Sequence, residues 1–159
     1  MFADSFPTKL RNLFDGKNKK KEVVFCGRLD NEQKCVYRVL DVWKILQRDC
    51  KDWNLRLIGD GPDREALQEK CARENIENVF FEGYQNPLQY YQRASILVMT
   101  SDFEGFPLVL AECMAFGVVP CVFDSFAAVH DILSNGKNGL IVEPEKDGSF
   151  SPKMMAEKM

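Results

Sequence analysis

The stretch ILVMTSDFEGFPLVLAECMAF, residues 96–116, decides the fold that the sequence predicts. Ile96–Met99 is a short apolar run typical of a buried strand, and Leu108–Phe116 is rich in good helix formers. A polar loop that contains a glycine and a proline lies between them. The stretch therefore predicts a strand, a loop and a helix, and we expect ligand chemistry at the loop and the helix start.

The same alternation continues along the rest of the chain. Apolar runs predict further strands at 23–25, 55–58, 79–81, 118–123 and 140–142, and apolar residues at helical spacing predict helices at 36–47, 64–75, 87–93 and 127–133. Strands separated by helices are typical of a parallel sheet with right-handed crossovers. We therefore expect an α/β fold: a Rossmann-like open parallel sheet with helices on both faces.

Two carboxylates, Glu104 and Glu112, flank the loop. Pro107 suits the first position of the following helix, where its missing N–H costs nothing, and the free N–H groups of that turn form an anion site. Glu112 lies one helical turn beyond Leu108 on the same face, and Glu104 reaches the same place from the loop. Because carboxylates accept hydrogen bonds from polyols, the pattern favours a sugar nucleotide over a bare nucleotide.

A diphosphate also needs cations between itself and those carboxylates. The first predicted strand runs directly into Arg28 and then Lys34, which places two cations at its carboxyl end, the edge where open parallel sheets bind ligands. Arg28 offers a bidentate fork for phosphate oxygens, and Lys34 offers a point charge for a second phosphate or a leaving group. The alternative is that both are solvated surface residues.

Five stretches carry a resemblance to a known family: VVFCGRLDNEQKCVYRVLDVWKIL, LRLIGDGPDREALQ, FFEGY, EGFPLVLAECMAFGVVPCV and NGKNGLIVEP, which together run from Val23 to Pro144. In this order they resemble the C-terminal nucleotide-sugar-binding domain of retaining GT-B glycosyltransferases of family 4 (group 1). The paired glutamates with seven residues between them are the most specific element. The resemblance implies one lobe of a GT-B fold and a nucleoside-diphosphate-sugar donor.

The resemblance also implies catalytic roles for three residues. Glu104 would meet hydroxyls of the donor sugar. Arg28 and Lys34 would hold the diphosphate and stabilise the negative charge that develops as the glycosidic bond to phosphate breaks, a form of electrostatic catalysis. No metal ion and no further cofactor would be required.

A second group of residues is implied in donor binding. Glu112 would meet the ribose, backbone amides around Phe106 and Leu108 would complete the phosphate site, and main-chain groups after the strand at 79–81 would meet the nucleobase. The full group is Gly83, Tyr84, Gly105, Phe106, Pro107, Leu108 and Glu112.

The chain departs from the family pattern in two places. Many relatives have glycine directly after the lysine, where this chain has Cys35, so the backbone there is less free to approach a ligand. Ala127, Ala128 and Asp131 stand where other members carry a pair of glycines and then a glutamate. Both departures concern the detailed geometry of the site rather than the class of protein.

The length of 159 residues fits one domain, whereas a GT-B enzyme needs two lobes. We therefore expect residues 1–22 to be an N-terminal segment and linker that includes the lysine-rich run Gly16–Lys21. Residues 23–159 would be the nucleotide-sugar-binding domain, truncated at its C-terminal end because Lys153–Met159 reads as the opening of a helix cut short. Without the missing N-terminal acceptor-binding domain, this piece should hold donor but not transfer sugar.

Charge and hydropathy narrow the partners and the compartment. The formal net charge of −3 indicates no basic domain, which favours a linker at Gly16–Lys21 over a nucleic-acid or membrane contact. No stretch is long and apolar enough to span a bilayer, and no signal-peptide core is found. We expect a cytoplasmic protein without nucleic-acid partners, and peripheral association of the full-length protein with the inner face of the membrane is compatible with the class.

The cysteines are predicted to be buried free thiols in a reducing compartment. None belongs to a Cys-x-x-Cys pair and several lie in apolar runs, which disfavours zinc and disulfides. They are Cys26, Cys35, Cys50, Cys71, Cys113 and Cys121.

Other features have simpler interpretations. Gly59–Pro62 begins like a dinucleotide fingerprint, but Arg64 occupies the place of the third glycine, which argues against a dehydrogenase or epimerase. His130 is interpreted as a surface or capping residue because no partner acid is evident. Asp102 either touches sugar or caps the loop. Tyr84, Tyr90 and Tyr91 could stack a base, although helix packing explains Tyr90 and Tyr91 more simply. The remaining alternative to an enzyme is a non-catalytic nucleotide-binding or interaction module on the same sheet.

Overall fold

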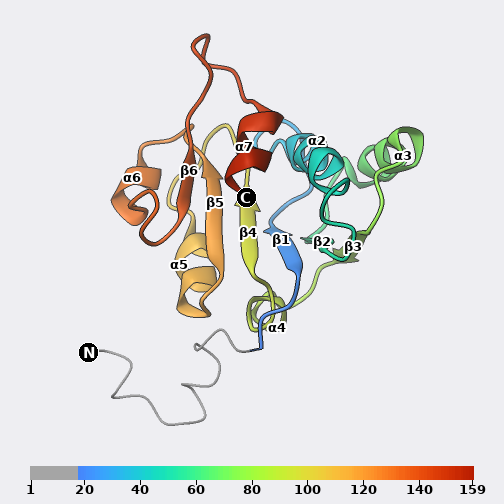
Figure 1. Ribbon diagram of the computed structural model, residues 1–159, viewed down its shortest axis with the longest axis horizontal. Helices are drawn as coiled ribbons and strands as arrows, with labels where there is room; N and C mark the ends of the chain where they lie inside the picture. The colour runs from blue at the N-terminus through green and yellow to red at the C-terminus, as the bar shows by residue number, and fades with distance from the viewer. Residues whose placement is uncertain (1–17) are drawn as a thin grey trace.

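The computed structural model describes residues 18–159, and a six-stranded parallel sheet forms its centre (Figure 1). The strands are β1 Glu22–Cys26, β2 Asn54–Ile58, β3 Val79–Gly83, β4 Ile96–Met99, β5 Val119–Phe123 and β6 Leu140–Val142. Their order in the sheet is β3-β2-β1-β4-β5-β6. The order therefore reverses between β1 and β4, which is where open sheets of this kind bind ligands.

The helices cover both faces of the sheet (Figure 1). They are α2 Val36–Leu46, α3 Arg64–Glu74, α4 Leu88–Tyr91, α5 Leu108–Ala115, α6 Ala128–Ile132 and α7 Pro152–Lys158. Helices α2, α3 and α7 pack on one face, and α4, α5 and α6 pack on the other. The predicted fold class is confirmed, and every predicted strand and helix is present with bounds that differ by at most two residues.

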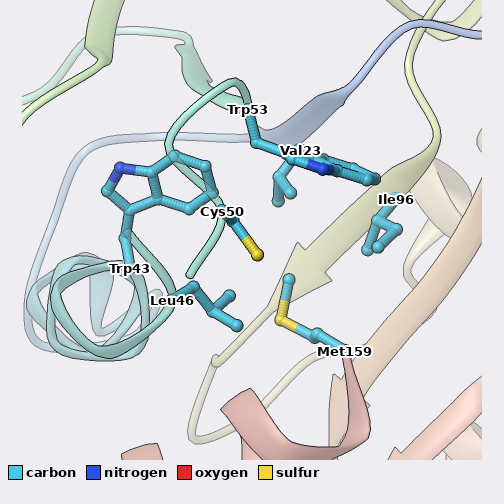
Figure 2. A pocket seen from close by; sticks show the side chains of 7 residues that line it. All are labelled: Val23, Trp43, Leu46, Cys50, Trp53, Ile96 and Met159. Carbon is cyan, nitrogen blue, oxygen red and sulfur yellow. The ribbon is translucent and has the colours of Figure 1, made fainter. Parts of the chain in front are cut away.

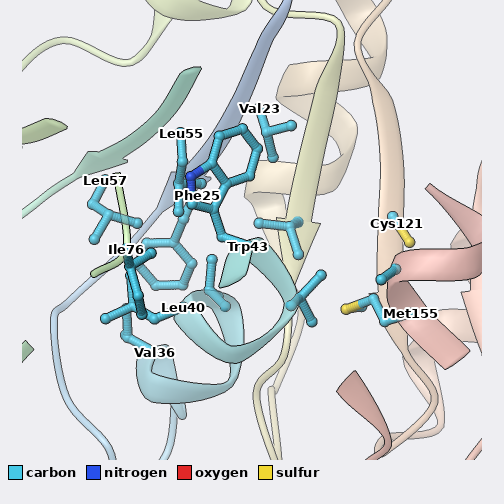
Figure 3. Close-up of a cluster of buried hydrophobic side chains, with 14 of the residues drawn as sticks. Val23, Phe25, Val36, Leu40, Trp43, Leu55, Leu57, Ile76, Cys121 and Met155 are labelled. Atoms are coloured by element: carbon cyan, nitrogen blue, oxygen red, sulfur yellow. The ribbon is translucent and has the colours of Figure 1, made fainter. Parts of the chain in front are cut away.

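Alternating side chains of the strands build two separate cores. In β1, Val23 and Phe25 enter the core beneath α2, whereas Val24 enters the opposite core. Figure 3 shows Trp43, Val23 and Phe25 in one cluster, and Nε1 of Trp43 donates to the carbonyl of Glu77 at 2.8 Å. Because β1 and β4 are covered on both faces, their central residues form continuous apolar runs, whereas β2 and β3 include the charged residues Arg56 and Glu82.

The second core fixes how α5 presents its outer face. Leu110 and Cys113 are fully buried against the sheet, while Leu108 is 62% exposed and Glu112 points outward one turn later. In α4, Tyr91 is completely buried, which confirms the packing interpretation for this tyrosine. The apolar positions of α5 thus decide that Glu112 faces solvent.

All six cysteines are free, as predicted, but the prediction that they are buried is wrong for three of them, because Cys26, Cys50 and Cys71 are partly exposed. Cys35, Cys113 and Cys121 are buried, and burial raises the pKa of both Cys113 and Cys121 to about 12. These two thiols therefore carry almost no thiolate at neutral pH and act as small apolar core residues.

The described part of the predicted linker is bound to the domain. Lys19 Nζ donates to the carbonyl of Tyr91 at 2.7 Å, Lys20 N donates to the carbonyl of Arg93 at 2.7 Å, and Lys21 pairs with Asp52. Gly16 and Lys17 lie outside the described residues. Within residues 18–159, no helix combines the length and apolar character needed to cross a membrane.

Two glycines bring the loop after β2 into backbone contact with the loop after β1. Gly59 has a φ of +129°, and a Cβ there would lie 2.0 Å from the carbonyl oxygen of Gly27. A Cβ at Gly61 would lie 2.4 Å from the carbonyl oxygen of Leu29, whose own N–H donates to Asp60 O at 3.0 Å. The segment Gly59–Pro62 thus supports the loop that carries Arg28 through backbone contacts.

Replacing Gly61 tests this contact. We expect Gly61→Ala to lower the free energy of unfolding by about 1–3 kcal/mol, because the new methyl group meets rigid backbone. Urea unfolding followed by circular dichroism measures the change. Gly105→Ala is the control, since nothing lies within 4 Å of its Cβ position, and it should stay within about 0.5 kcal/mol of wild type. Equal losses in both variants would contradict the proposed close packing.

Candidate functional site

The candidate site lies at the carboxyl ends of β1 and β4, where the order of the sheet reverses. The loop after β1 covers residues 27–35, and the loop after β4 covers residues 100–107. Asp102 N donates to the carbonyl of Gln33 at 2.9 Å, and Gln33 Nε2 donates to the carbonyl of Phe103 at 3.1 Å. The two loops that carry the predicted basic pair and the first glutamate are therefore joined directly.

Lys34 and Glu104 form an ion pair across these loops. Lys34 Nζ lies 2.5 Å from Glu104 Oε1, and the same oxygen accepts a hydrogen bond from Ser101 Oγ at 2.8 Å. The Lys34 side chain is 19% exposed and the Glu104 side chain 10%. Lys34 is thus not a freely solvated surface lysine, and two residues with separate predicted roles hold each other in place.

Hydrogen bonds within the first loop determine where Lys34 points. Asp30 Oδ1 accepts from the backbone N–H groups of Gln33 and Lys34 at 2.8 and 3.1 Å, which closes a turn just before the lysine side chain. Cys35 follows in the left-handed region, with φ 50° and ψ 48°, and α2 begins at the next residue. The chain therefore keeps at Cys35 a backbone conformation that favours glycine.

Arg28 remains exposed. Its side chain is 68% accessible, and its nearest acidic partner is Asp30 Oδ2, 4.0 Å from Nε. The guanidinium is therefore accessible to a ligand, and it is equally consistent with the solvated alternative. Its loop is held from below by the close contact between Gly61 and Leu29.

The helix start differs from the prediction by one residue. Pro107 has φ −78° and ψ 85°, so it forms an inverse γ-turn and α5 begins at Leu108. The placement of Pro107 at the first helical position is wrong, because its ψ value lies outside the helical region although its φ fits. As a result, Leu108 N donates to the carbonyl of Phe106 at 2.9 Å. The side chains of Phe106 and Leu108 are both exposed, and the space around Gly105 is open.

The charges of Glu112 and Lys34 both influence the pKa of Cys26, at the end of β1. Burial is the main cause that raises the pKa of Cys26, the charge of Glu112 adds to the rise, and the charge of Lys34 opposes it. No side-chain hydrogen bond or ion pair reaches Glu112 from residues 18–159, so its carboxylate is available to a ligand. The charges of Lys34 and Glu112 thus both reach Cys26, and Lys34 contacts Glu104 directly.

Gly83 and Tyr84 lie on the same edge but farther from the ion pair, since β2 separates β3 from β1. Gly83 has a φ of +71°, and its carbonyl accepts from Gly59 N at 2.8 Å. Tyr84 is 82% exposed. The predicted base-binding segment, Gly83 and Tyr84, therefore lies at the same edge of the sheet as the Lys34–Glu104 ion pair but not in contact with it.

Arg38 is a residue that the sequence analysis missed. Its Nη1 lies 2.5 Å from Asp102 Oδ1 and donates to the carbonyl of Thr100 at 3.1 Å. Its guanidinium also lies 5.3 to 5.6 Å from the centres of the Tyr37, Phe123 and Phe150 rings. Arg38 thus anchors the loop that carries Glu104, and Asp102 is the carboxylate of that loop that binds Arg38. Apart from Tyr37, these partners lie 62 to 112 residues from Arg38 in sequence, so no local pattern marks it.

His130 is exposed, as predicted, and it also has an acidic partner that the sequence analysis missed. Its Nε2 lies 2.9 Å from both carboxylate oxygens of Asp124. Asp124 directly follows β5, and α6 brings His130 back over it. The partner was not evident because an acid six residues away is brought close only by the turn between β5 and α6.

Two hollows lie at the opposite, amino edge of the sheet. The first is an apolar cavity of about 50 Å³ (Figure 2), lined by Val23, Trp43, Leu46, Cys50, Trp53, Ile96 and Met159. The second, of about 340 Å³, lies between the start of β5 and the turn at residues 136–140. Neither includes a predicted site residue, and the apolar lining of the first does not suit a sugar or a phosphate.

The family follows from comparison with known proteins. The model of the family described as glycosyl transferases group 1 matches residues 8–156. The chain belongs to this family. The chain is also 36% identical over 136 residues to a lipopolysaccharide 1,6-galactosyltransferase of Salmonella typhimurium, in an alignment that covers 80% of this chain and 37% of that protein.

Solved structures share the fold of this group 1 domain. TarM of S. aureus, a G117R mutant in complex with fondaparinux, alpha-GlcNAc-glycerol and UDP, matches with a TM-score of 0.81 and 23% identity, over 91% of this chain and 28% of TarM. The C-terminal domain of the group 1 protein LpcC from Francisella tularensis matches with a TM-score of 0.73 and 22% identity, over 88% of this chain and 73% of that domain. The sheet is thus a Rossmann-like lobe of the GT-B type, and the chain spans just over a third of the length of the Salmonella relative.

The left-handed backbone at Cys35 is testable through two replacements of this residue. We expect Cys35→Gly to be more stable than Cys35→Ala by about 1 kcal/mol, because both lose the thiol but only glycine adopts this conformation without strain. Urea unfolding of the two variants measures the difference. A Cys35→Ala variant as stable as Cys35→Gly would show that the backbone there is unstrained.

Proposed function

We propose that this group 1 domain is the C-terminal, donor-binding lobe of a retaining glycosyltransferase of family 4 that uses a nucleoside-diphosphate sugar. The observation that carries the proposal is the Lys34–Glu104 ion pair at the edge where the sheet order reverses. It joins an acceptor for sugar hydroxyls to a cation for phosphate, and the exposed Glu112 lies on α5, the helix that follows the loop of Glu104. A nucleotide sugar needs both kinds of group at one place.

The proposed catalytic role of each charged residue follows from its position. Glu104 accepts hydrogen bonds from donor-sugar hydroxyls through Oε2, the carboxylate oxygen that Lys34 and Ser101 leave open. Lys34 and the exposed Arg28 hold the diphosphate and stabilise the charge that develops on it when the bond to the sugar breaks. Because Lys34 is already fixed by Glu104, little side-chain reorganisation is needed when donor binds.

The donor-binding residues extend along the edge on both sides of this pair. We assign the ribose to Glu112, whose carboxylate is exposed on α5. The phosphate approaches the open backbone from Gly105 to Leu108, where the Leu108 amide must exchange its bond to Phe106 for one to the ligand. The nucleobase meets the main chain at Gly83 and the exposed ring of Tyr84, which offers a face for stacking.

The activity of the whole protein is part of the same proposal. A lobe of this kind needs an N-terminal acceptor-binding lobe, so residues 1–159 alone should bind donor without transferring sugar. The galactosyltransferase relative acts on lipopolysaccharide, which supports an acceptor in a cell-surface polysaccharide or glycolipid. We place the full-length protein in the cytoplasm, or at the inner face of the membrane where such acceptors are assembled.

Calorimetry with UDP, GDP and their sugars tests the site. We expect Arg28→Ala and Glu112→Ala each to weaken nucleotide binding by about 10-fold, because each removes a charged hydrogen-bonding group. Glu104→Ala should mainly reduce the preference for a sugar nucleotide over the bare diphosphate. UDP is the first probe, since the structurally similar TarM was solved with UDP.

Matched controls separate the site from general surface charge. Arg73→Ala removes an arginine with the same 68% exposure as Arg28, and Glu157→Ala removes an exposed carboxylate on α7. Both should bind like wild type. Equal affinities in wild type and all three site variants would remove the site assignment, and a folded wild type that binds no nucleotide would leave an interaction module as the alternative.

We also propose that donor binding needs no metal ion, because Arg28 and Lys34 supply the cations that a diphosphate requires. Excess EDTA should therefore leave the dissociation constant of the sugar nucleotide unchanged within about 2-fold. This is well below the 10-fold change that corresponds to about 1.4 kcal/mol of binding free energy. Calorimetry with and without added Mg²⁺ or Mn²⁺ checks this. A loss of binding in EDTA that Mg²⁺ or Mn²⁺ restores would overturn the metal-free assignment.

A further inference from the structure

Arg64 is the strongest feature that the proposed function does not use. It is the residue that breaks the dinucleotide fingerprint after Gly59–Pro62, and it begins α3 at the carboxyl edge of the sheet. A Cβ built on Gly83 would lie 3.6 Å from Nη1 of Arg64. The guanidinium therefore lies directly beside Gly83 and Tyr84, the segment to which the nucleobase is assigned.

Three contacts hold the guanidinium in this place. Nη2 donates to the carbonyl of Phe81 at 3.1 Å, Nη1 lies 3.4 Å from Asp60 Oδ2, and Cζ lies 5.9 Å from the centre of the Phe81 ring. Asp60 is itself held, because its Oδ1 accepts from Gly61 N at 2.8 Å. A guanidinium that is positioned before the ligand arrives loses little conformational entropy when it binds.

The guanidinium keeps donors for a ligand. An arginine side chain has five N–H donors and no acceptor, and within residues 18–159 Asp60 and the Phe81 carbonyl are hydrogen-bonded to two of its nitrogens. The side chain is 29% exposed, so part of it is accessible from solvent. Arg64 can therefore donate to an acceptor on a ligand but cannot accept from one.

The main chain of the same segment is already partly used. The carbonyl of Gly83 accepts from Gly59 N at 2.8 Å, and Gly83 pairs with Ile58 in the sheet. The exposed ring of Tyr84 offers stacking, which does not select between bases because every base has a π-face. Selection between bases therefore depends on a polar group at the edge of the base, and Arg64 is placed to supply it.

Nucleobases differ in what they present to such a donor. Uracil and guanine have a ring carbonyl where cytosine and adenine have an amino group. A carbonyl oxygen accepts a hydrogen bond from the guanidinium. An amino group would face the guanidinium donor to donor, and leaving both groups without an acceptor costs binding free energy.

We propose that Arg64 is a specificity-determining residue of the donor site, and that it selects a uracil or guanine nucleotide over a cytosine or adenine nucleotide through the carbonyl of the base. The inference rests on the proposed function and adds to it the class of base that the donor carries. It also gives a role to the arginine that replaces the third glycine of the fingerprint.

Calorimetry with UDP and CDP tests the inference. The two nucleotides differ only in the carbonyl of uracil, which is an amino group in cytosine, and in the proton on the neighbouring ring nitrogen. We expect wild type to bind UDP at least about 10-fold more tightly than CDP, because a site that donates to a carbonyl rejects the analogue that lacks it. GDP and ADP are the second pair, and the same ratio is measured with them.

Variants of Arg64 identify the source of the preference. Arg64→Gln should reduce the ratio to about 3-fold or less, because a glutamine amide both donates and accepts. Arg64→Lys should keep most of the preference, because an ammonium group only donates. Arg73→Gln changes an exposed arginine near the end of the same helix and is the matched control, so it should keep the wild-type ratio.

The ratio separates base selection from a structural role of Arg64, since a loss of folded protein would affect both nucleotides of a pair equally. Arg64→Gln with the wild-type ratio would overturn the inference while leaving the donor site intact. The same holds for a wild type that binds both members of each pair equally or prefers CDP or ADP. A folded wild type that binds none of the four nucleotides would instead contradict the donor site itself, so the two failures are distinguishable.

Discussion

The ion pair between Lys34 and Glu104 is the interaction on which the site depends. It joins the loop after β1 to the loop after β4 at the point where the sheet order reverses, and the backbone bonds between Gln33 and Asp102 hold the same two loops. Since both side chains are largely buried, removing one partner would leave the other charge poorly solvated. The pair is therefore part of the architecture of the edge as well as of its proposed chemistry.

Backbone constraints on both sides of the pair support it. Gly59 and Gly61 allow the turn after β2 to contact the loop of Arg28, because no Cβ fits there. Cys35 keeps a left-handed conformation that ends the loop and starts α2. Arg38, one turn into that helix, then anchors the opposite loop through Asp102. The edge is thus shaped by backbone contacts and anchored charges, while the ligand-facing groups Arg28 and Glu112 remain accessible.

The charge balance of the edge constrains what the site can bind. Carboxylates suit a polyol but oppose a diphosphate, and most cations of the edge are already paired. Arg28, whose side chain is exposed, is the cation of the edge that a carboxylate holds least closely.

The sequence by itself determined the strands, the helices, the parallel sheet and the family, because short apolar runs and helical spacing are local properties that tertiary contacts here reinforce. It also predicted that Arg28, Lys34, Glu104 and Glu112 lie at one edge, since the loops that follow adjacent parallel strands meet there. Only the tertiary structure decided that Lys34 pairs with Glu104, that Arg38 anchors Asp102 and that Asp124 holds His130. The reason is physical: each of these contacts depends on how loops fold over the sheet edge, and two of them join residues more than 60 positions apart that no local pattern relates.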